Sequence, residues 1–315
     1  MASEDIVTVE KVIKDFRPGF GLRKKRVLHG ISLGVREGEI FGFVGPNGAG
    51  KTTTLKILLG LISASAGRAT ILGHDVQESG FRRQIGFLPE NPYFHEFLTG
   101  REFLRFYARL ASVPRGRREE RIQELLGWVG LSHAGNARLR TYSKGMLQRL
   151  GIAQALVHDP KVVFLDEPMS GLDPIGRKDI RDLILRLRED GKTVFMNTHI
   201  LHDVEMLCDR VAIIVAGKIQ WEGRMEEFSH DRELRSDVVL ARLSPETATL
   251  LEDRFGALLR GHGERVELTV AQKHVEGVLG AALGSGAEVV SVTPRRASLE
   301  AIFLSTVGRG SKEGA

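Results

Sequence analysis

Apolar residues recur along this 315-residue chain at two different spacings. Alternating or continuous apolar runs predict strands, at 6–12, 27–35, 39–44, 162–165 and 193–197. Apolar residues three and four positions apart predict helices, at 52–61, 99–110, 117–129 and 177–188. The run at 211–220 is typical of a final hairpin. Strands that alternate with helices indicate a largely parallel sheet and an α/β fold class, with a helical insert at 99–129.

The pattern changes after residue 225. Three strand-like runs each precede a helix-like run, in the order 238–243, 245–255, 266–270, 275–283, 289–292 and 299–307. Three strand–helix pairs predict a small α+β domain over residues 226–315, beside a larger domain over residues 5–225. No cluster of His, Cys or acidic residues in this tail has catalytic or metal-binding spacing. We therefore expect it to be an accessory or regulatory domain.

The most specific pattern is a glycine-rich loop between a predicted strand and a predicted helix. It fits G-x-x-x-x-G-K-[ST] at every required position, and with the next threonine its residues are Gly45, Pro46, Asn47, Gly48, Ala49, Gly50, Lys51, Thr52 and Thr53. Glycines let backbone N–H groups converge on phosphate oxygens, and Lys51 adds a positive charge at the β- and γ-phosphates. The Thr52 hydroxyl is suited to bind Mg²⁺. The loop therefore predicts a nucleotide held with Mg²⁺ at a helix start.

Two acids and a histidine follow the apolar strands at 162–165 and 193–197. Asp166 suits the coordination shell of Mg²⁺, and Glu167 suits a general base that polarises the attacking water. Because neighbouring side chains of a strand point to opposite faces, the two acids can serve different partners. His199 would hydrogen-bond the γ-phosphate and hold the water. Alone, these residues would also fit acids capping a strand in solvent and a structural histidine, but the phosphate loop favours catalysis.

A second helix start has the features of an anion site. Ser143 opens an apolar helix within the sequence Tyr-Ser-Lys-Gly-Met-Leu-Gln-Arg, and the N–H groups near Gly145 are free to meet phosphate. Without the other nucleotide motifs, Ser143 would be read only as a helix cap.

Together these motifs resemble the ABC ATPase family over about residues 5–225. Its Walker A matches 45–52, its Walker B 162–166 with the catalytic glutamate at Glu167, its D-loop 170–173, its signature 142–146 and its switch histidine His199. The resemblance implies a P-loop ABC nucleotide-binding domain with a mixed sheet core and a helical subdomain. It also implies ATP as cofactor, with Asp173 at the nucleotide site. The partner would be a second ATPase subunit, a homodimer in which Ser143 and Gly145 cap the opposite ATP.

Three positions depart from the family pattern. The signature has Lys144 for glycine and Met146 for glutamine. Glu90 stands where the family places a glutamine; its carboxylate can reach Mg²⁺ or its water, and its charge near Glu167 could slow turnover. The aromatic that stacks on adenine would be Phe16 in place of tyrosine, with Phe20 a weaker candidate and burial of Phe16 in the core the alternative.

A short segment at 298–304 resembles the closing helix of the ABC-2 type export ATPases, which carry a small extra domain there. This implies an exporter whose membrane-spanning part is a separate integral membrane subunit. In the family, that subunit docks beside the Q-loop, where aromatics at 93, 94 and 97 would line the groove, unless they belong to the core.

The alternative is a soluble ABC ATPase acting on nucleic acid or the ribosome. The basic clusters at 23–26 and 115–118 and the pI of about 9.4 would be its footprint, although both clusters also fit ordinary solvated surface. The chain has one cassette and no heptad run between Lys51 and Ser143, which favours the transporter. We therefore expect no nucleic acid partner.

Composition adds an expected location. Hydrophobic residues make up 42% of the chain, enough for a sizeable core, yet no apolar run approaches the length of a membrane span. The first ten residues lack the features of a secretory signal, and the only cysteine is Cys208, so no intrachain disulfide is possible. We expect a cytoplasmic protein, peripheral at the inner face of the cell membrane.

Overall fold

The computed structural model describes residues 5–17, 24–78, 80–225, 235–260 and 265–295. Contacts within the chain divide it into two compact units, with the boundary between Gly223 and Arg224. That the predicted ranges, 5–225 and 226–315, are two domains with separate folds and roles stays a prediction. Among the described residues, no helix is long and apolar enough to cross a membrane.

The first unit is built on two sheets. The six-stranded sheet has, in spatial order, β10 (Lys218–Arg224), β9 (Arg210–Val215), β3 (Ile40–Val44), β8 (Thr193–Thr198), β7 (Val162–Asp166) and β6 (Ile85–Leu88). The four-stranded sheet has β2 (Lys25–Arg36), β1 (Asp5–Phe16), β4 (Ala66–Ile71) and β5 (His74–Asp75). β3 is parallel to β8 and β9, and β7 is parallel to β6 and β8. The prediction of a largely parallel sheet is confirmed for these strands, and the second sheet is antiparallel.

The central strands are buried on both faces, as is typical of parallel strands. Every residue of β3, β7 and β8 is buried, as expected for strands covered on both sides. The predicted final hairpin is present as β9 and β10. Its two connecting residues, Ala216 and Gly217, have φ of 47° and 74°, the positive pair that a type I′ turn requires.

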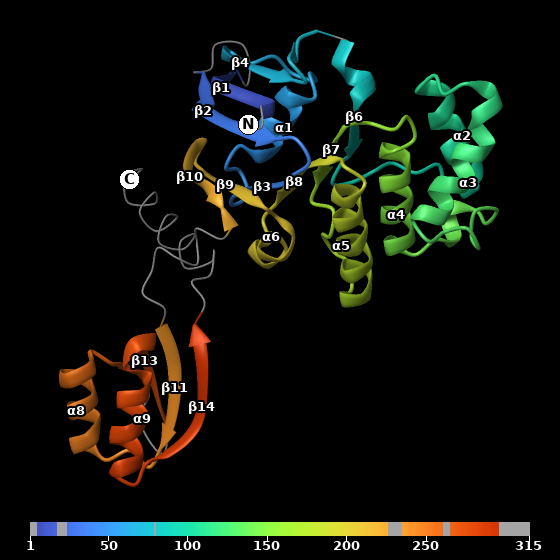
Figure 1. Ribbon diagram of the computed structural model, residues 1–315. Helices are drawn as coiled ribbons and strands as arrows, with labels where there is room; N and C mark the ends of the chain where they lie inside the picture. The colour runs from blue at the N-terminus through green and yellow to red at the C-terminus, as the bar shows by residue number, and fades with distance from the viewer. Residues whose placement is uncertain (1–4, 18–23, 79, 226–234, 261–264, 296–315) are drawn as a thin grey trace. The chain divides into compact units, whose positions relative to one another are not determined.

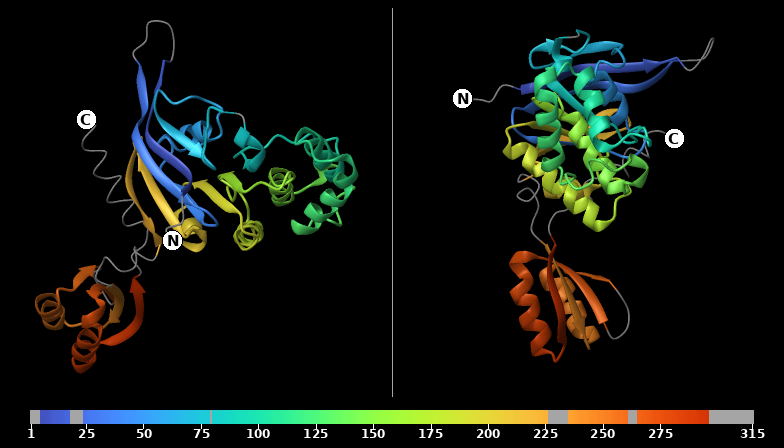
Figure 2. Two further views of the ribbon diagram at one scale, coloured as in Figure 1. Left: turned by 45° about the horizontal axis from the view of Figure 1, so that its top comes forward. Right: turned by 90° about the vertical axis from the view of Figure 1, so that its right-hand side faces the viewer.

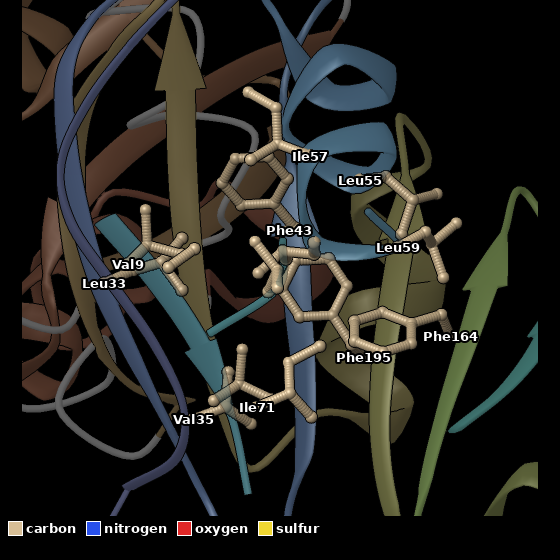
Figure 3. Packing of buried hydrophobic residues seen from close by; sticks show 14 of the residues in the cluster. Val9, Leu33, Val35, Phe43, Leu55, Ile57, Leu59, Ile71, Phe164 and Phe195 are labelled. Carbon is tan, nitrogen blue, oxygen red and sulfur yellow. The ribbon is translucent and has the colours of Figure 1, made fainter. Parts of the chain in front are cut away.

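Phenylalanine rings from neighbouring strands form the centre of the core (Figure 3). The ring centroid of Phe195 in β8 lies 5.6 Å from that of Phe43 in β3 and 5.5 Å from that of Phe164 in β7. Helix α1 (Lys51–Leu58) packs Leu55 and Ile57 into the same cluster. The core therefore fixes the start of α1 against the ends of β3, β7 and β8.

The predicted helical insert forms a separate group of helices. Figures 1 and 2 show α2 (Gly100–Leu110), α3 (Arg118–Trp128) and α4 (Lys144–Ala155) together on the β6–β7 side of the sheet. Thr99 and Glu102 form a capping box that starts α2. The remaining helices of this unit are α5 (Pro174–Glu189), α6 (Leu201–Leu207) and the short turns η1 (Gly80–Gln84), η2 (Arg115–Arg117) and η3 (Leu139–Thr141).

The second unit has one antiparallel sheet and two helices. Its strands lie in the order β12 (Leu258–Arg260), β13 (Arg265–Ala271), β11 (Arg235–Ala241) and β14 (Glu288–Arg295), with α8 (Pro245–Phe255), η4 (Gln272–His274) and α9 (Val275–Gly284). Along the chain this is strand–helix–strand–strand–helix–strand, the split βαβ arrangement. A small core joins Val238 and Leu268 of the sheet to Leu251 of α8 and Val278 of α9. The predicted helix at 299–307 lies outside the described residues.

Candidate functional site

The glycine-rich loop connects the end of β3 to the start of α1. Gly50 caps α1 with φ of 111°, a conformation that side-chain-bearing residues rarely adopt. A Cβ on Gly45 would lie 2.2 Å from the carbonyl oxygen of Ile214, so only glycine fits there. Both glycines are thus required by the backbone path that turns the loop's N–H groups toward the helix start.

Lys51 begins α1 and lies almost buried against its own loop. Its Nζ donates to the carbonyl oxygen of Gly45 at 2.7 Å, and 6% of the residue is exposed. Burial lowers the pKa of the Lys51 ammonium, while the nearby carboxylates, Glu167 foremost, oppose this shift. Backbone carbonyls and nearby negative charges therefore hold the Lys51 ammonium at the loop. A phosphate bound there would interact with its positive charge.

The two acids of the apolar strand are both buried but have different partners. Asp166 Oδ1 accepts a hydrogen bond from Asn197 Nδ2 at 2.5 Å. Burial raises the pKa of Asp166, the bond from Asn197 opposes the rise, and the negative charges of Glu167 and Glu90 add to it. The two acids therefore contact different side chains, while their predicted partners, Mg²⁺ for Asp166 and the attacking water for Glu167, stay predictions.

Glu167 is held by the following strand. Its Oε1 lies 2.8 Å from His199 Nδ1, and its Oε2 accepts from Thr198 Oγ1 at 3.2 Å. Its own N–H donates to the carbonyl of Asn197 at 2.8 Å. The side chain of Glu167 is 8% exposed and that of His199 is 46% exposed. A buried carboxylate fixed at both oxygens beside an open histidine is an arrangement that can orient a water for attack.

The backbone of Glu167 explains why both acids reach the same space. Its φ is 49°, in the left-handed region, whereas Asp166 ends the strand β7. The chain turns at Glu167, so the alternation of a straight strand no longer applies. Both carboxylates consequently line one cavity.

That cavity, of about 350 Å³, lies at the carboxyl ends of β3, β7 and β8. Predicted residues that line it are Asn47, Gly48, Gly50, Lys51, Thr52, Thr53, Glu90, Asp166, Glu167 and His199. Open α/β sheets bind ligands at this edge. The structure therefore brings together the loop, both acids, the histidine and Glu90, which replaces the glutamine of the family.

Comparison with known proteins decides the family. A family model described as ABC transporter matches residues 28–170. An ABC transporter ATP-binding protein of Synechocystis is 43% identical over 305 residues, which cover 95% of this chain and 84% of that relative. The chain belongs to the ABC transporter ATP-binding proteins.

Two further matches extend this result. The bacitracin transport ATP-binding protein BcrA of Bacillus licheniformis is 36% identical, over 91% of this chain and 94% of BcrA. The dimeric post-hydrolysis structure of the ATP-binding cassette MJ0796 with ADP and Pi has a TM-score of 0.63 and 26% identity, over 70% of this chain and 98% of that one. The alternative of a soluble ATPase acting on nucleic acid gains no support from these matches.

The family gives the cavity its ligand and its reaction. The chain binds ATP and hydrolyses it as the ATP-binding subunit of an ABC transporter. ABC ATP-binding subunits work with transmembrane subunits. The roles of the individual residues remain predictions that the geometry supports.

The residues around the cavity also fit Mg²⁺. Among the residues that the structure describes, no cluster of three His, Cys, Asp or Glu side chains could hold a metal ion by itself. In ATPases, Mg²⁺ is bound by one or two protein oxygens together with phosphate oxygens and water. Asn197 Oδ1 is buried at the cavity and accepts no hydrogen bond within the described structure. It is therefore suited to accept from a metal-bound water beside Asp166 and Thr52.

Three predicted site positions, in the signature and the D-loop, lie away from the cavity of this ABC ATPase. Ser143 caps α4, its Oγ accepting from Met146 N–H at 3.2 Å, and Gly145 follows in the first turn. Asp173 caps α5 in the same way, its Oδ1 accepting from Gly176 N–H at 2.8 Å. Within one chain, Ser143 therefore acts as a helix cap. If the signature contacts nucleotide, that nucleotide is bound by another copy.

The start of α4 packs on the loop that follows Glu167. Gln148 Nε2 donates to the carbonyl of Pro168 at 2.9 Å. The ammonium of Lys144 lies against Gly171, at the place where any larger residue would put its Cβ. Signature and D-loop are therefore in contact inside one chain.

Phe16 is not part of the core, so the alternative of burial is wrong. The residue is 39% exposed, and Lys14 Nζ lies 5.0 Å from its ring centroid. Phe16 does not line the cavity in the described residues, and stacking on adenine stays a prediction. Phe20 lies outside the described residues.

Two lining residues were missed from the sequence. Asn197 is 1% exposed and is a polar residue inside an apolar strand, a signal that could have identified it. Val27, from β2, also lines the cavity, and its apolar side chain in a strand gave no signal.

Proposed function

We propose that two copies of this chain close on two ATP molecules and power export through a separate integral membrane subunit. The observation that carries the dimer is the position of the signature. Ser143 is exposed at the start of α4 and takes no part in lining the ATP cavity of its own chain. A helix start with free N–H groups is suited to phosphate, so a second copy supplies what the first one lacks.

Each residue of the cavity has a defined task in this proposal. The loop and Lys51 hold the phosphates, and Thr52, Asp166 and Glu90 hold Mg²⁺ or its waters, which neutralises charge on the phosphates when the ion is bound. Glu167 takes the proton of the attacking water, and His199 keeps that carboxylate oriented. The 2.8 Å distance between His199 Nδ1 and Glu167 Oε1 supports this pairing.

Export is the direction that the relatives favour. BcrA, matched over almost its whole length, is named for bacitracin transport, and DrrA3 of Streptomyces coeruleorubidus, 35% identical over 92% of this chain, is named for daunorubicin resistance. An exporter motor of this type would lie peripherally at the cytoplasmic face of the membrane, held there by its membrane subunit.

Exposed aromatics beside Glu90 are suited to that contact. Tyr93 is 78% exposed and Phe97 is 77% exposed. Phe94, which we expected to join them, is half-buried, and its ring centroid lies 5.2 Å from that of Phe103 in α2. Docking thus falls to Tyr93 and Phe97, while Phe94 holds the segment on the helical region.

The test is co-expression of the chain with a candidate membrane subunit, followed by fractionation and vesicle transport. We expect much more of the chain in the membrane fraction with that subunit than without it, and ATP-dependent uptake of cargo into inside-out vesicles. Tyr93→Ala with Phe97→Ala should reduce recruitment and leave basal hydrolysis unchanged. No increase in recruitment with the membrane subunit, or co-purification with RNA alone, would contradict the proposal.

A further inference from the structure

The helical region carries a strongly basic stretch that the proposed function does not use. Residues 103–118 contain five arginines and no acid, and they span most of α2, η2 and the start of α3. Figure 1 shows α2 and α3 side by side at the outer side of the helical group. The stretch therefore places a concentrated positive charge at one end of a helix pair.

Two of the five arginines have structural partners. Arg105 Nε pairs with Glu119 Oε1 at 2.5 Å, and Arg118 Nε donates to the carbonyl of Val113 at 2.7 Å. The other three are exposed and form no ion pair or side-chain hydrogen bond within the described structure: Arg109, Arg115 and Arg117. By contrast, Arg26 of the first basic cluster is paired with Asp15 at 2.8 Å. Arg109, Arg115 and Arg117 therefore leave their charges available.

Apolar side chains are exposed beside these arginines. Leu110 is 64% exposed and Phe106, one helical turn earlier, is 45% exposed. Arginine stems can lie on apolar surface while their charges reach outward. Exposed leucine and phenylalanine next to unpaired arginines are typical of protein segments that lie at a membrane surface.

We propose that the α2–α3 turn, residues 106–117, binds the headgroups of anionic phospholipids. Arginines alone would also suit nucleic acid phosphates, but an exposed leucine gains nothing from a phosphate backbone and gains burial in a lipid interface. The patch is continuous with the docking aromatics, because His95 has ring contacts with Tyr93 at 5.2 Å and Phe106 at 6.4 Å. The inference rests on the proposed membrane location and adds a lipid contact to the subunit contact.

The experiment is co-sedimentation of the purified full chain with vesicles. The vesicles are phosphatidylcholine alone or mixed with phosphatidylglycerol, each at low and high salt. We expect binding to the anionic vesicles, weakened by salt. The variant Arg109→Gln/Arg115→Gln/Arg117→Gln should bind them roughly 100-fold more weakly. The control Lys56→Gln/Arg83→Gln/Lys178→Gln removes three exposed charges elsewhere and should bind within a few-fold of the native chain.

A second variant separates lipid from nucleic acid. Leu110→Ser should weaken vesicle binding at both salt concentrations, because its contribution is apolar. Equal binding to neutral and anionic vesicles would overturn the proposal, as would equal loss in the arginine variant and the control. Displacement by single-stranded RNA together with no effect of Leu110→Ser would overturn it in favour of nucleic acid.

ATP hydrolysis measured on the same samples keeps the two proposals distinguishable. The arginine variant should hydrolyse ATP like the native chain, since none of its three residues lines the cavity. A chain that hydrolyses ATP and is recruited by its membrane subunit but ignores anionic vesicles would contradict the lipid contact alone. A chain that binds anionic vesicles but never responds to a membrane subunit would contradict the proposed function alone.

Discussion

The helix starts of α1 and α4 differ in how many functional side chains surround them. At the start of α1, Lys51 is buried, and its loop, both acids and His199 converge on one cavity. At the start of α4, Ser143 caps only its own helix and stands exposed. A polar group that already has its partner gains little from further contacts, whereas an exposed helix start is free to bind. The difference indicates that one chain forms the cavity for ATP by itself, whereas the start of α4 is available to the second copy that we propose.

The sharpest test of the cavity at the start of α1 is Glu167→Gln, which keeps the shape of the side chain and removes its basicity. We expect ATP binding to persist and hydrolysis to fall by about 10²–10⁴-fold, because general-base assistance is of that size. Phosphate release in single turnover and nucleotide binding measure the two effects. Glu189→Gln, an exposed acid at the far end of α5, is the matched control. Phosphate release near the native rate would remove Glu167 from the role of base.

The start of α4 is tested by Ser143→Arg. This substitution should barely alter the ATP affinity of the isolated chain and should abolish cooperative hydrolysis. A bulky cation at this position would block the approach of the second copy. Mixing this variant with Lys51→Ala provides the stronger measurement, since one composite site of the mixed dimer keeps an intact loop and an intact signature. Partial activity should return on mixing. Full activity of the single variant would show that the start of α4 does not meet nucleotide.

Asn197→Ala removes the side chain that holds Asp166 in the cavity. The hydrogen bond from Asn197 to the Asp166 carboxylate is a bond to a charged group, worth about 1.5–3 kcal/mol. We expect hydrolysis to slow roughly 10- to 100-fold and to need more Mg²⁺, measured as initial rates across a magnesium titration. The thermal midpoint serves as the folding control. An unchanged magnesium dependence would mean that Asn197 only fills space.

The smallest expected effect is a shift of the pH profile in Glu90→Gln. The charge of Glu90 raises the pKa of Asp166 and also raises that of Lys51. Removing it lowers both, so the acidic limb and the basic limb of the pH–rate profile should both move to lower pH. Rates across pH, with binding saturated at each point, provide the measurement. Limbs that move apart, or upward, would contradict the arrangement of charges around the cavity.

Local spacing explains how much of the site was predictable. The loop at 45–52 and the acids after the strand at 162–165 are contiguous in sequence, so their motifs carry their own geometry. Asn197 and Val27 join the site only through the pairing of distant strands, which no local pattern records. The common orientation of Asp166 and Glu167 depends on a positive φ at a glutamate, which its residue type does not encourage.

The strands, too, were predicted where the local pattern is strong and missed where it is weak. Strands that are apolar throughout, such as β3 and β8, were predicted within a residue or two. β4 and β6 were missed, since β4 begins with Ala-Gly-Arg and β6 has only four residues. Their place in the sheets comes from pairing with β1 and β7, a tertiary effect. In the second unit, β12 was missed for the same reason, being three residues long.

The left-handed backbone at Glu167 places catalysis and folding in conflict at one position. A non-glycine residue in that region costs on the order of 1–3 kcal/mol, and here hydrogen bonds with Asn197, Thr198 and His199 hold Glu167 in place. Glycine would relax the backbone but remove the proposed base, so without a need for ATP hydrolysis this position would drift toward residues that give a higher melting temperature. Selection for stability alone would favour the loss of this side chain.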